Sequence, residues 1–235
     1  MRGFFGFLGF VAVLIVLLAA FAVPAVVGPV VATAVRAASP FGDQPLDVQV
    51  DVDPIGLIRG FVREVHVSGA SLERDGATIK SLDVTVRAVG IGDHAFTDAL
   101  GGLRGVGIPT FDGSVISVDR ITLSGSSRAL IAEATLKREA ALAFVQHQFD
   151  VRGITISGLE LTPGGVSLVL FEQRIPLQIG VQDGALVIPD LLGGGPLELL
   201  APLPEDPWRL TGATITPNGI VIDATVDVGA ILGGA

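Results

Sequence analysis

The most informative stretch of this chain is Val62-Arg63-Glu64-Val65-His66-Val67-Ser68-Gly69, because it recurs along the sequence. It aligns without gaps to residues 151–158, Val-Arg-Gly-Ile-Thr-Ile-Ser-Gly, and a shorter copy spans residues 120–125. A late copy, residues 212–219, ends in Thr-Pro-Asn-Gly, and residues 162–165 read Thr-Pro-Gly-Gly. The shared pattern predicts a strand, a glycine, a second short strand and a turn in which Gly or Asn adopts positive φ. Duplication and convergent hairpin chemistry both explain it, and both predict antiparallel hairpins.

Strict alternation of apolar and polar residues predicts further strands, each with one wet and one apolar face. The alternating segments are residues 46–53, 82–88, 175–182 and 220–228. In contrast, residues 166–171 are apolar on both faces apart from one serine, which predicts a central strand covered on both sides.

The sequence pattern predicts few helices. Thr135 is expected to cap a helix from Leu136 to about Gln148, with its apolar residues on one stripe. A shorter helical turn is expected after Pro54, ending near Gly60. We therefore predict an α+β domain in which a long, curved antiparallel β-sheet is wrapped around one main α-helix.

The N-terminal segment predicts a membrane anchor. No residue from Gly3 to Val35 is charged, and residues 4–23 have about the length of a bilayer-spanning helix. Arg2 places the N-terminus in the cytoplasm and the remainder outside. Residues 32–34, Ala-Thr-Ala, also fit a signal-peptide cleavage site, but the length of the apolar stretch favours an uncleaved transmembrane helix. We expect a single-pass cell-membrane protein whose domain is extracytoplasmic, in the periplasm or cell envelope.

Composition limits the partners and the chemistry. The mean hydropathy of +0.66 excludes a disordered chain. Residues 1–36 contain two basic residues and no acidic one, so the remainder carries 13 basic against 24 acidic residues, a net charge of −11. Such an acidic surface repels nucleic acid. The absence of cysteine excludes disulfides and Cys-based metal sites.

No catalytic pattern is present. The sequence contains no HExxH, G-x-S-x-G or Walker A motif, and its three histidines have no metal-ligand spacing. Asp47, Asp51 and Asp53 could bind calcium, although a solubilising strand face explains them as well. A hydrolase would need two convergent carboxylates or a Ser-His pair, which the pattern does not supply. We predict no enzyme, no catalytic residue, no metal and no cofactor.

The apolar strand faces need a partner, and one helix covers only part of a sheet of this size. Residues 99–109 and 189–204 are rich in Gly or Pro yet apolar, which predicts loops that form a pocket mouth, dock on a membrane or fill the core. A lipid suits this surplus of apolar surface. The candidate lipid-binding residues are Phe144, Val145 and Phe149 on the helix, Leu168 and Leu170 on the central strand, Leu191, Leu192, Leu199 and Leu200 at the mouth, and Arg104 and Trp208 for a headgroup.

An ordered set of fold-forming residues runs through residues 44–229. It comprises Pro54, Leu57, Ile58 and Gly60, then Val65-His66-Val67 and Gly69, the helix to Phe149, Ile154-Thr155-Ile156, Pro163-Gly164-Gly165, Pro207, and Thr216-Pro217-Asn218-Gly219-Ile220. In this set the chain resembles the LmeA-like phospholipid-binding family of actinobacterial cell-envelope proteins. The resemblance implies phospholipid binding by a curved sheet and helix, as in tubular lipid-binding domains, and a role in building lipid-linked envelope glycans. The chain departs from the family in having no Tyr, only two Lys and a long N-terminal apolar segment.

These observations divide the chain into residues 1–36 (membrane anchor or signal segment), 37–43 (linker), 44–229 (β-rich lipid-binding domain) and 230–235 (C-terminal tail). The predicted function is phospholipid binding or transfer outside the cytoplasm in support of envelope lipid or lipoglycan assembly. The alternative is a non-catalytic structural module that assists an envelope synthase through protein contacts. The expected partners are the membrane, a phospholipid or related lipid, and an envelope-assembly protein, but not nucleic acid.

Overall fold

The computed structural model describes residues 44, 46–74, 76–91, 95–109, 115–170, 173–190, 195–203 and 206–233. The predicted transmembrane segment and linker lie outside these residues. Within the described ranges, no helix is both long enough and apolar enough to span a bilayer.

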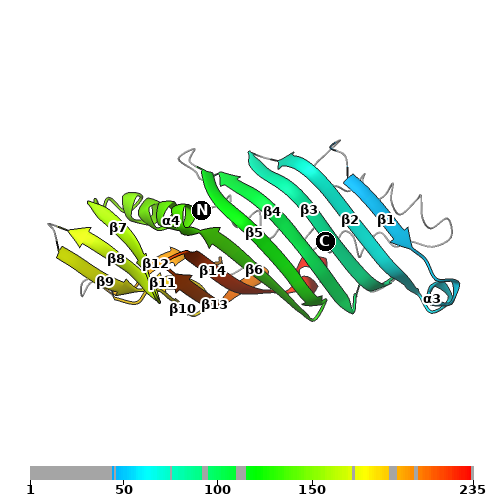
Figure 1. Cartoon of the computed structure of the whole chain (residues 1–235). Helices are drawn as coiled ribbons and strands as arrows, with labels where there is room; N and C mark the ends of the chain where they lie inside the picture. Colours follow the sequence, from blue (N-terminus) through cyan, green and yellow to red (C-terminus); the bar gives the residue numbers. More distant parts are fainter. Residues whose placement is uncertain are drawn as a thin grey trace.

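A large antiparallel sheet forms most of the molecule (Figure 1). Its eight strands lie in the spatial order β1-β2-β3-β4-β5-β6-β14-β13. They are β1 (Leu46–Asp51), β2 (Phe61–Arg74), β3 (Ala77–Gly90), β4 (Asp98–Pro109), β5 (Val115–Ser126), β6 (Ala129–Lys137), β13 (Trp208–Thr216) and β14 (Gly219–Val226). The prediction of a mainly antiparallel β-sheet with little helix is thereby confirmed. The alternating segments 46–53, 82–88 and 220–228 supply β1, β3 and β14.

Two small antiparallel sheets lie at one end of the large sheet (Figure 1). They are built from β7 (Gly158–Thr162), β8 (Gly165–Leu170) and β9 (Gln173–Gln178), and from β10 (Gly180–Gln182), β11 (Ala185–Ile188) and β12 (Leu197–Leu200). The Pro163-Gly164 turn joins β7 to β8, with Gly164 at φ +79°, as its turn chemistry predicts. β8 is the central strand of its sheet, as predicted, and its residues 166–168 are buried, whereas Phe171 lies outside the described residues.

The second copy of the repeat does not form a strand, so that prediction is wrong. Residues 151–157 contain no strand, and β7 begins only at Gly158. The backbone N–H of Val151 donates to the carbonyl of His147, and that of Arg152 donates to the carbonyl of Phe149. These turns complete the preceding helix and end in Gly153 at φ +71°. The same local sequence therefore serves as a helix terminus here and as strand β2 in its first copy.

The main helix, α4 (Arg138–Asp150), starts later than the sequence indicates. Thr135 and Leu136 belong to β6, where they pair with Val221 and Ile220 of β14. Thr135 is therefore not a cap, and the residue at the N-cap, Lys137, makes no side-chain capping bond. Strand pairing accounts for the difference, because β-branched threonine packs well on a sheet and tertiary contacts override capping preference.

The glycine-rich segment 99–109, predicted to be a loop, is strand β4 inside the large sheet. Its glycines are required by close contact between strands. A Cβ atom on Gly102 would overlap the carbonyl oxygen of Ile121 on β5, and Gly101 has φ +147°. Part of the second predicted loop, 189–204, is also a strand, β12, whereas Leu191 and Leu192 lie outside the described residues.

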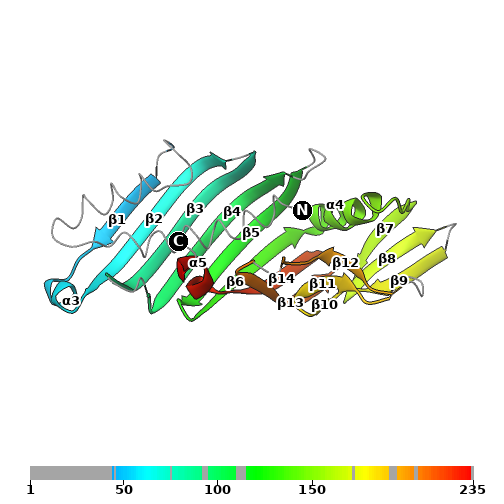
Figure 2. The same cartoon turned by 180° about the vertical axis from the view of Figure 1, so that it is seen from behind.

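Two short helices complete the fold. Figure 2, seen from behind, shows α5 (Val228–Gly233) in front of the large sheet. Asp227 caps it, since its Oδ1 accepts from the N–H of Ala230 at 2.9 Å. The predicted tail, residues 230–235, begins inside α5. The turn predicted after Pro54 is confirmed as α3 (Pro54–Ile58), which begins where the carboxylate of Asp53 accepts from the N–H of Gly56 at 3.0 Å.

We expect Asp53→Ala to lower the free energy of unfolding by about 1 kcal/mol, because it removes the α3 cap. Urea unfolding of the detergent-solubilised chain measures this loss. The control is Asp47→Ala, which removes an exposed carboxylate that contacts only Gln49 among the described residues and should change stability by less than about 0.5 kcal/mol. Equal effects of the two changes would contradict a capping role for Asp53.

Candidate functional site

The large sheet has one apolar and one polar face. On the apolar side, residues paired across β2, β3 and β4 are aliphatic in successive rows, as in Val67 opposite Val84 and Leu82 opposite Leu103. All of these side chains are buried. We call the apolar side of β2–β4 the aliphatic face, and it consists of Val65, Val67, Leu82, Val84, Val86 and Leu103.

Helix α4 covers a different part of the apolar side. It packs on β5, β6 and β14 and on β7 of the small sheet. Beneath it the sheet carries small side chains, Ala132 and Ala134 on β6 and Ala224 on β14, which let the helix axis approach closely. Helix α4 makes no comparable contact with β2–β4, and α3 packs on β2. In the described part of the chain, α4 therefore covers one end of the sheet, and α5 lies against the sheet nearer its middle (Figure 2).

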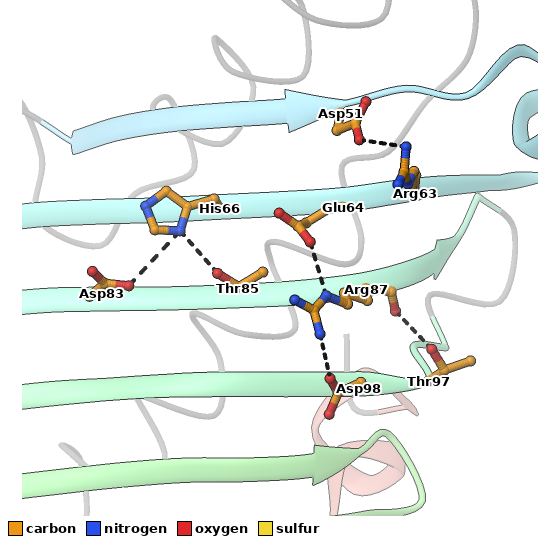
Figure 3. A network of polar contacts seen from close by, with 9 residues as sticks. All are labelled: Asp51, Arg63, Glu64, His66, Asp83, Thr85, Arg87, Thr97 and Asp98. Atoms are coloured by element: carbon orange, nitrogen blue, oxygen red, sulfur yellow. Dashed lines mark hydrogen bonds and ion pairs between the residues drawn. The ribbon is translucent and has the colours of Figure 1, made fainter.

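The opposite side of β1–β4 carries a network of charged and polar residues (Figure 3). Arg87 of β3 contacts Glu64 of β2 at 2.9 Å and Asp98 of β4 at 3.4 Å, and Arg63 contacts Asp51 at 3.3 Å. The hydrogen bond and charge of Glu64, with a smaller contribution from Asp98, raise the pKa of Arg87. These charged groups keep this face of the sheet hydrated, whereas the opposite face is apolar and favours contact with other apolar groups.

One cluster on the polar face resembles a catalytic triad in composition but not in geometry. His66 Nδ1 lies 3.0 Å from Thr85 Oγ1 and 3.9 Å from Asp83 Oδ1 (Figure 3). A triad needs the hydroxyl and the carboxylate on different ring nitrogens, so that one orients the imidazole while the other gives up its proton. Here both approach Nδ1. Moreover, no group of three or more His, Asp or Glu in the described ranges could hold a metal ion.

Most of the predicted site residues come together at the α4 end of the molecule. Phe144, Val145 and Phe149 face inward from α4 and are buried. They share one core with buried side chains of β8, β12 and β13, namely Leu168, Leu199, Leu200 and Trp208. Arg152 links the C-terminal end of α4 to β12, because its guanidinium donates hydrogen bonds to the carbonyl oxygens of Gln148 and Glu198. The same core cluster also includes the side chains of the aliphatic face.

The remaining predicted residues are placed elsewhere. Arg104 is exposed on the polar face of β4, directly opposite Arg120 of β5. Both line a hollow of about 400 Å³ together with Ser81 and Asp83. Leu191, Leu192 and the side chain of Leu170 lie outside the described residues. The structure therefore separates Arg104 from the apolar side chains with which the sequence grouped it.

The aliphatic face was not among the predicted site residues, although its signal is present in the sequence. Alternation over residues 82–88 places Val84 and Val86 on one side of a strand, and Val65 and Val67 alternate likewise in the opening repeat. At the margin of this face, beside edge strand β1, lies a hollow of about 500 Å³ lined by Leu46, Asp47, Ser68, Gly69 and Ala70.

Comparison with known proteins gives one match. A family model described as LmeA-like phospholipid-binding matches residues 18–225, which include most of the described chain. No curated protein and no solved structure matches the chain.

Proposed function

Because the chain belongs to the LmeA-like phospholipid-binding family, we propose that it holds a phospholipid with the acyl chains against the aliphatic face. The observation that supports this proposal is the aliphatic face itself, which lies beyond the part of the sheet that α4 covers. Helix α4 packs over β5, β6 and β14, whereas the valine and leucine side chains of β2–β4 form a separate, fully buried apolar surface. A sheet needs a second apolar layer on such a face, and acyl chains can supply it.

The energetics of burial favour a lipid ligand. Each buried methylene contributes about 0.8 kcal/mol, so ten methylenes contribute on the order of 8 kcal/mol before the cost of ordering the ligand. Aliphatic contact then provides most of the affinity, and few polar contacts are needed at the headgroup. In this proposal the domain resembles tubular lipid-binding domains, with α4 closing one end of the curved sheet.

The cellular setting is part of the proposal. The uncharged segment from Gly3 to Val35, preceded by Arg2, supports a membrane anchor with the domain outside the cytoplasm. A tethered phospholipid-binding domain can receive a lipid from the outer leaflet and pass it on in envelope lipid or lipoglycan assembly. No bond is made or broken in this role, so the protein acts as a binding or transfer protein and not as an enzyme.

A photoreactive phospholipid tests the binding mode. The full chain is reconstituted into vesicles that contain a phospholipid with a diazirine at the end of one acyl chain, and adducts are mapped by mass spectrometry. We expect adducts on peptides from residues 61–109, which carry β2–β4. A matched probe with the diazirine on the headgroup should leave the aliphatic face unlabelled.

Adducts confined to residues 1–43 would contradict the proposal, since they would come from a bilayer-embedded segment alone. That result would favour the alternative function, a structural module that assists an envelope synthase through protein contacts. In that case the apolar side of β2–β4 would have to bind protein rather than lipid.

A further inference from the structure

The short helix α3 presents large apolar side chains to solvent. Ile58 is 87% exposed and Ile55 is 59% exposed, on a helix of five residues. The next residue, Arg59, is also exposed. We call Ile55, Ile58 and Arg59 the α3 edge. Two solvent-exposed isoleucines on one short helix are unusual for a surface that has no binding partner.

The α3 edge lies beside the end of the aliphatic face. It connects β1 to β2 at the far end of the large sheet from α4 (Figure 1). Just beyond α3, the carbonyl of Gly60 accepts a hydrogen bond at 2.8 Å from the N–H of Ile91, the residue that follows β3. The next strand residues facing inward, Val62 on β2 and Val89 on β3, are paired and buried. Apolar side chains thus continue from the interior of the sheet to its margin and out to α3.

The α3 edge carries a cation, Arg59, although the whole chain has a net charge of −9. Of the neighbouring acidic residues, Asp51 contacts Arg63 and Asp53 accepts the N-cap hydrogen bond of α3. Arg59 has no ion-pair partner within the described ranges. An anionic bilayer repels an acidic domain, so an apolar edge with an unpaired arginine is the orientation in which such a domain approaches lipid most favourably.

We propose that the α3 edge is the surface through which the domain docks on an anionic phospholipid bilayer. Ile55 and Ile58 enter the boundary between headgroups and acyl chains, while the long side chain of Arg59 reaches the lipid phosphates. Docking here sets the end of the aliphatic face against the leaflet, so that a phospholipid can move between them without crossing water. This inference deepens the proposed function and rests on it.

A single introduced cysteine tests the docking directly, because the chain has none of its own. Ile58→Cys is labelled with an environment-sensitive fluorophore, and the full chain is reconstituted in phosphatidylcholine vesicles with and without phosphatidylglycerol. Lipids with a spin label near the headgroup should quench the fluorophore, and more strongly when phosphatidylglycerol is present. The matched control is Val115→Cys, which is similarly exposed at 61% but begins the interior strand β5, opposite Pro109 at the end of β4. Equal quenching at both positions, or none at position 58, would overturn the proposal.

A second pair of variants tests the consequence for lipid entry. The double change Ile55→Asp and Ile58→Asp should slow the appearance of acyl-chain adducts on residues 61–109 about fivefold, since charged side chains oppose insertion. Val115→Asp should leave the rate unchanged. Adducts that form at the normal rate in the double variant would refute docking through α3 while leaving the proposed function intact. Quenching at position 58 without any adduct on β2–β4 would support docking and contradict the proposed lipid site.

Discussion

Replacing Val84 by tryptophan is expected to reduce the phospholipid carried by each chain at least about tenfold. Val84 is buried at the centre of the aliphatic face, paired with Val67 and Gly101. Because Val84 is fully buried, an indole at this position displaces the groups that pack on it, which in the proposed complex include acyl chains. Since each displaced methylene removes about 0.8 kcal/mol, displacing two of them lowers the affinity roughly tenfold. The measurement is native mass spectrometry of the full chain released from detergent, followed by organic extraction and quantification of phospholipid.

The neighbouring residue supplies the control. Asp83→Trp introduces the same side chain one position earlier on β3, on the polar face, and should leave lipid loading unchanged. Retention of lipid by the Val84 variant would contradict binding on the aliphatic face. Loss of folding in that variant alone would show a tightly packed core, because overpacking such a core costs about 1–3 kcal/mol, and would favour the protein-contact alternative.

The second large effect is expected at the other end of the molecule, where Phe149→Ala should lower the free energy of unfolding by about 3–5 kcal/mol. Phe149 is fully buried where α4 meets the core shared with β8, β12 and β13. Truncating the ring removes its apolar contacts and leaves a cavity that rigid neighbouring strands cannot close. Urea unfolding followed by circular dichroism measures the loss.

Val151→Ala, two residues further on, is the matched control. Val151 is 39% exposed at the C-cap of α4, and its truncation should cost less than about 0.5 kcal/mol. A loss below about 1 kcal/mol for Phe149→Ala would mean that the α4 end is loosely packed. If the folded fraction of that variant also lost its phospholipid, the lipid site would extend to α4, as the sequence-based grouping of Phe144 and Phe149 supposes.

Features encoded locally were predictable from the sequence. Period-two alternation is a property of a few consecutive residues, so it correctly placed Val84 on β3 and Ile222 on β14 on the buried side. The Pro163-Gly164 and Pro217-Asn218 turns were equally readable, because Gly and Asn meet the backbone demands of hairpins.

Features determined by distant contacts were not predictable. Gly102 reads as a loop residue, yet it is needed inside β4 because the backbone of β5 passes close to it. Thr135 reads as a cap, yet it pairs with Val221, some distance along the chain. The extent of the aliphatic face was likewise not predictable from the sequence. It depends on where α4 lies across the sheet, and no run of neighbouring residues specifies that position.

The strand order has a consequence for the order in which the chain folds. Each strand from β1 to β5 pairs with its immediate successor, so these contacts are local and form early. The pairing of β6 with β14, such as Leu130 with Val226, must wait until α4 and both small sheets have emerged. The aliphatic face is therefore assembled, and β6 is an unprotected edge, before the last hairpin arrives. In that interval the nascent chain has the greatest need of a chaperone or a nearby membrane.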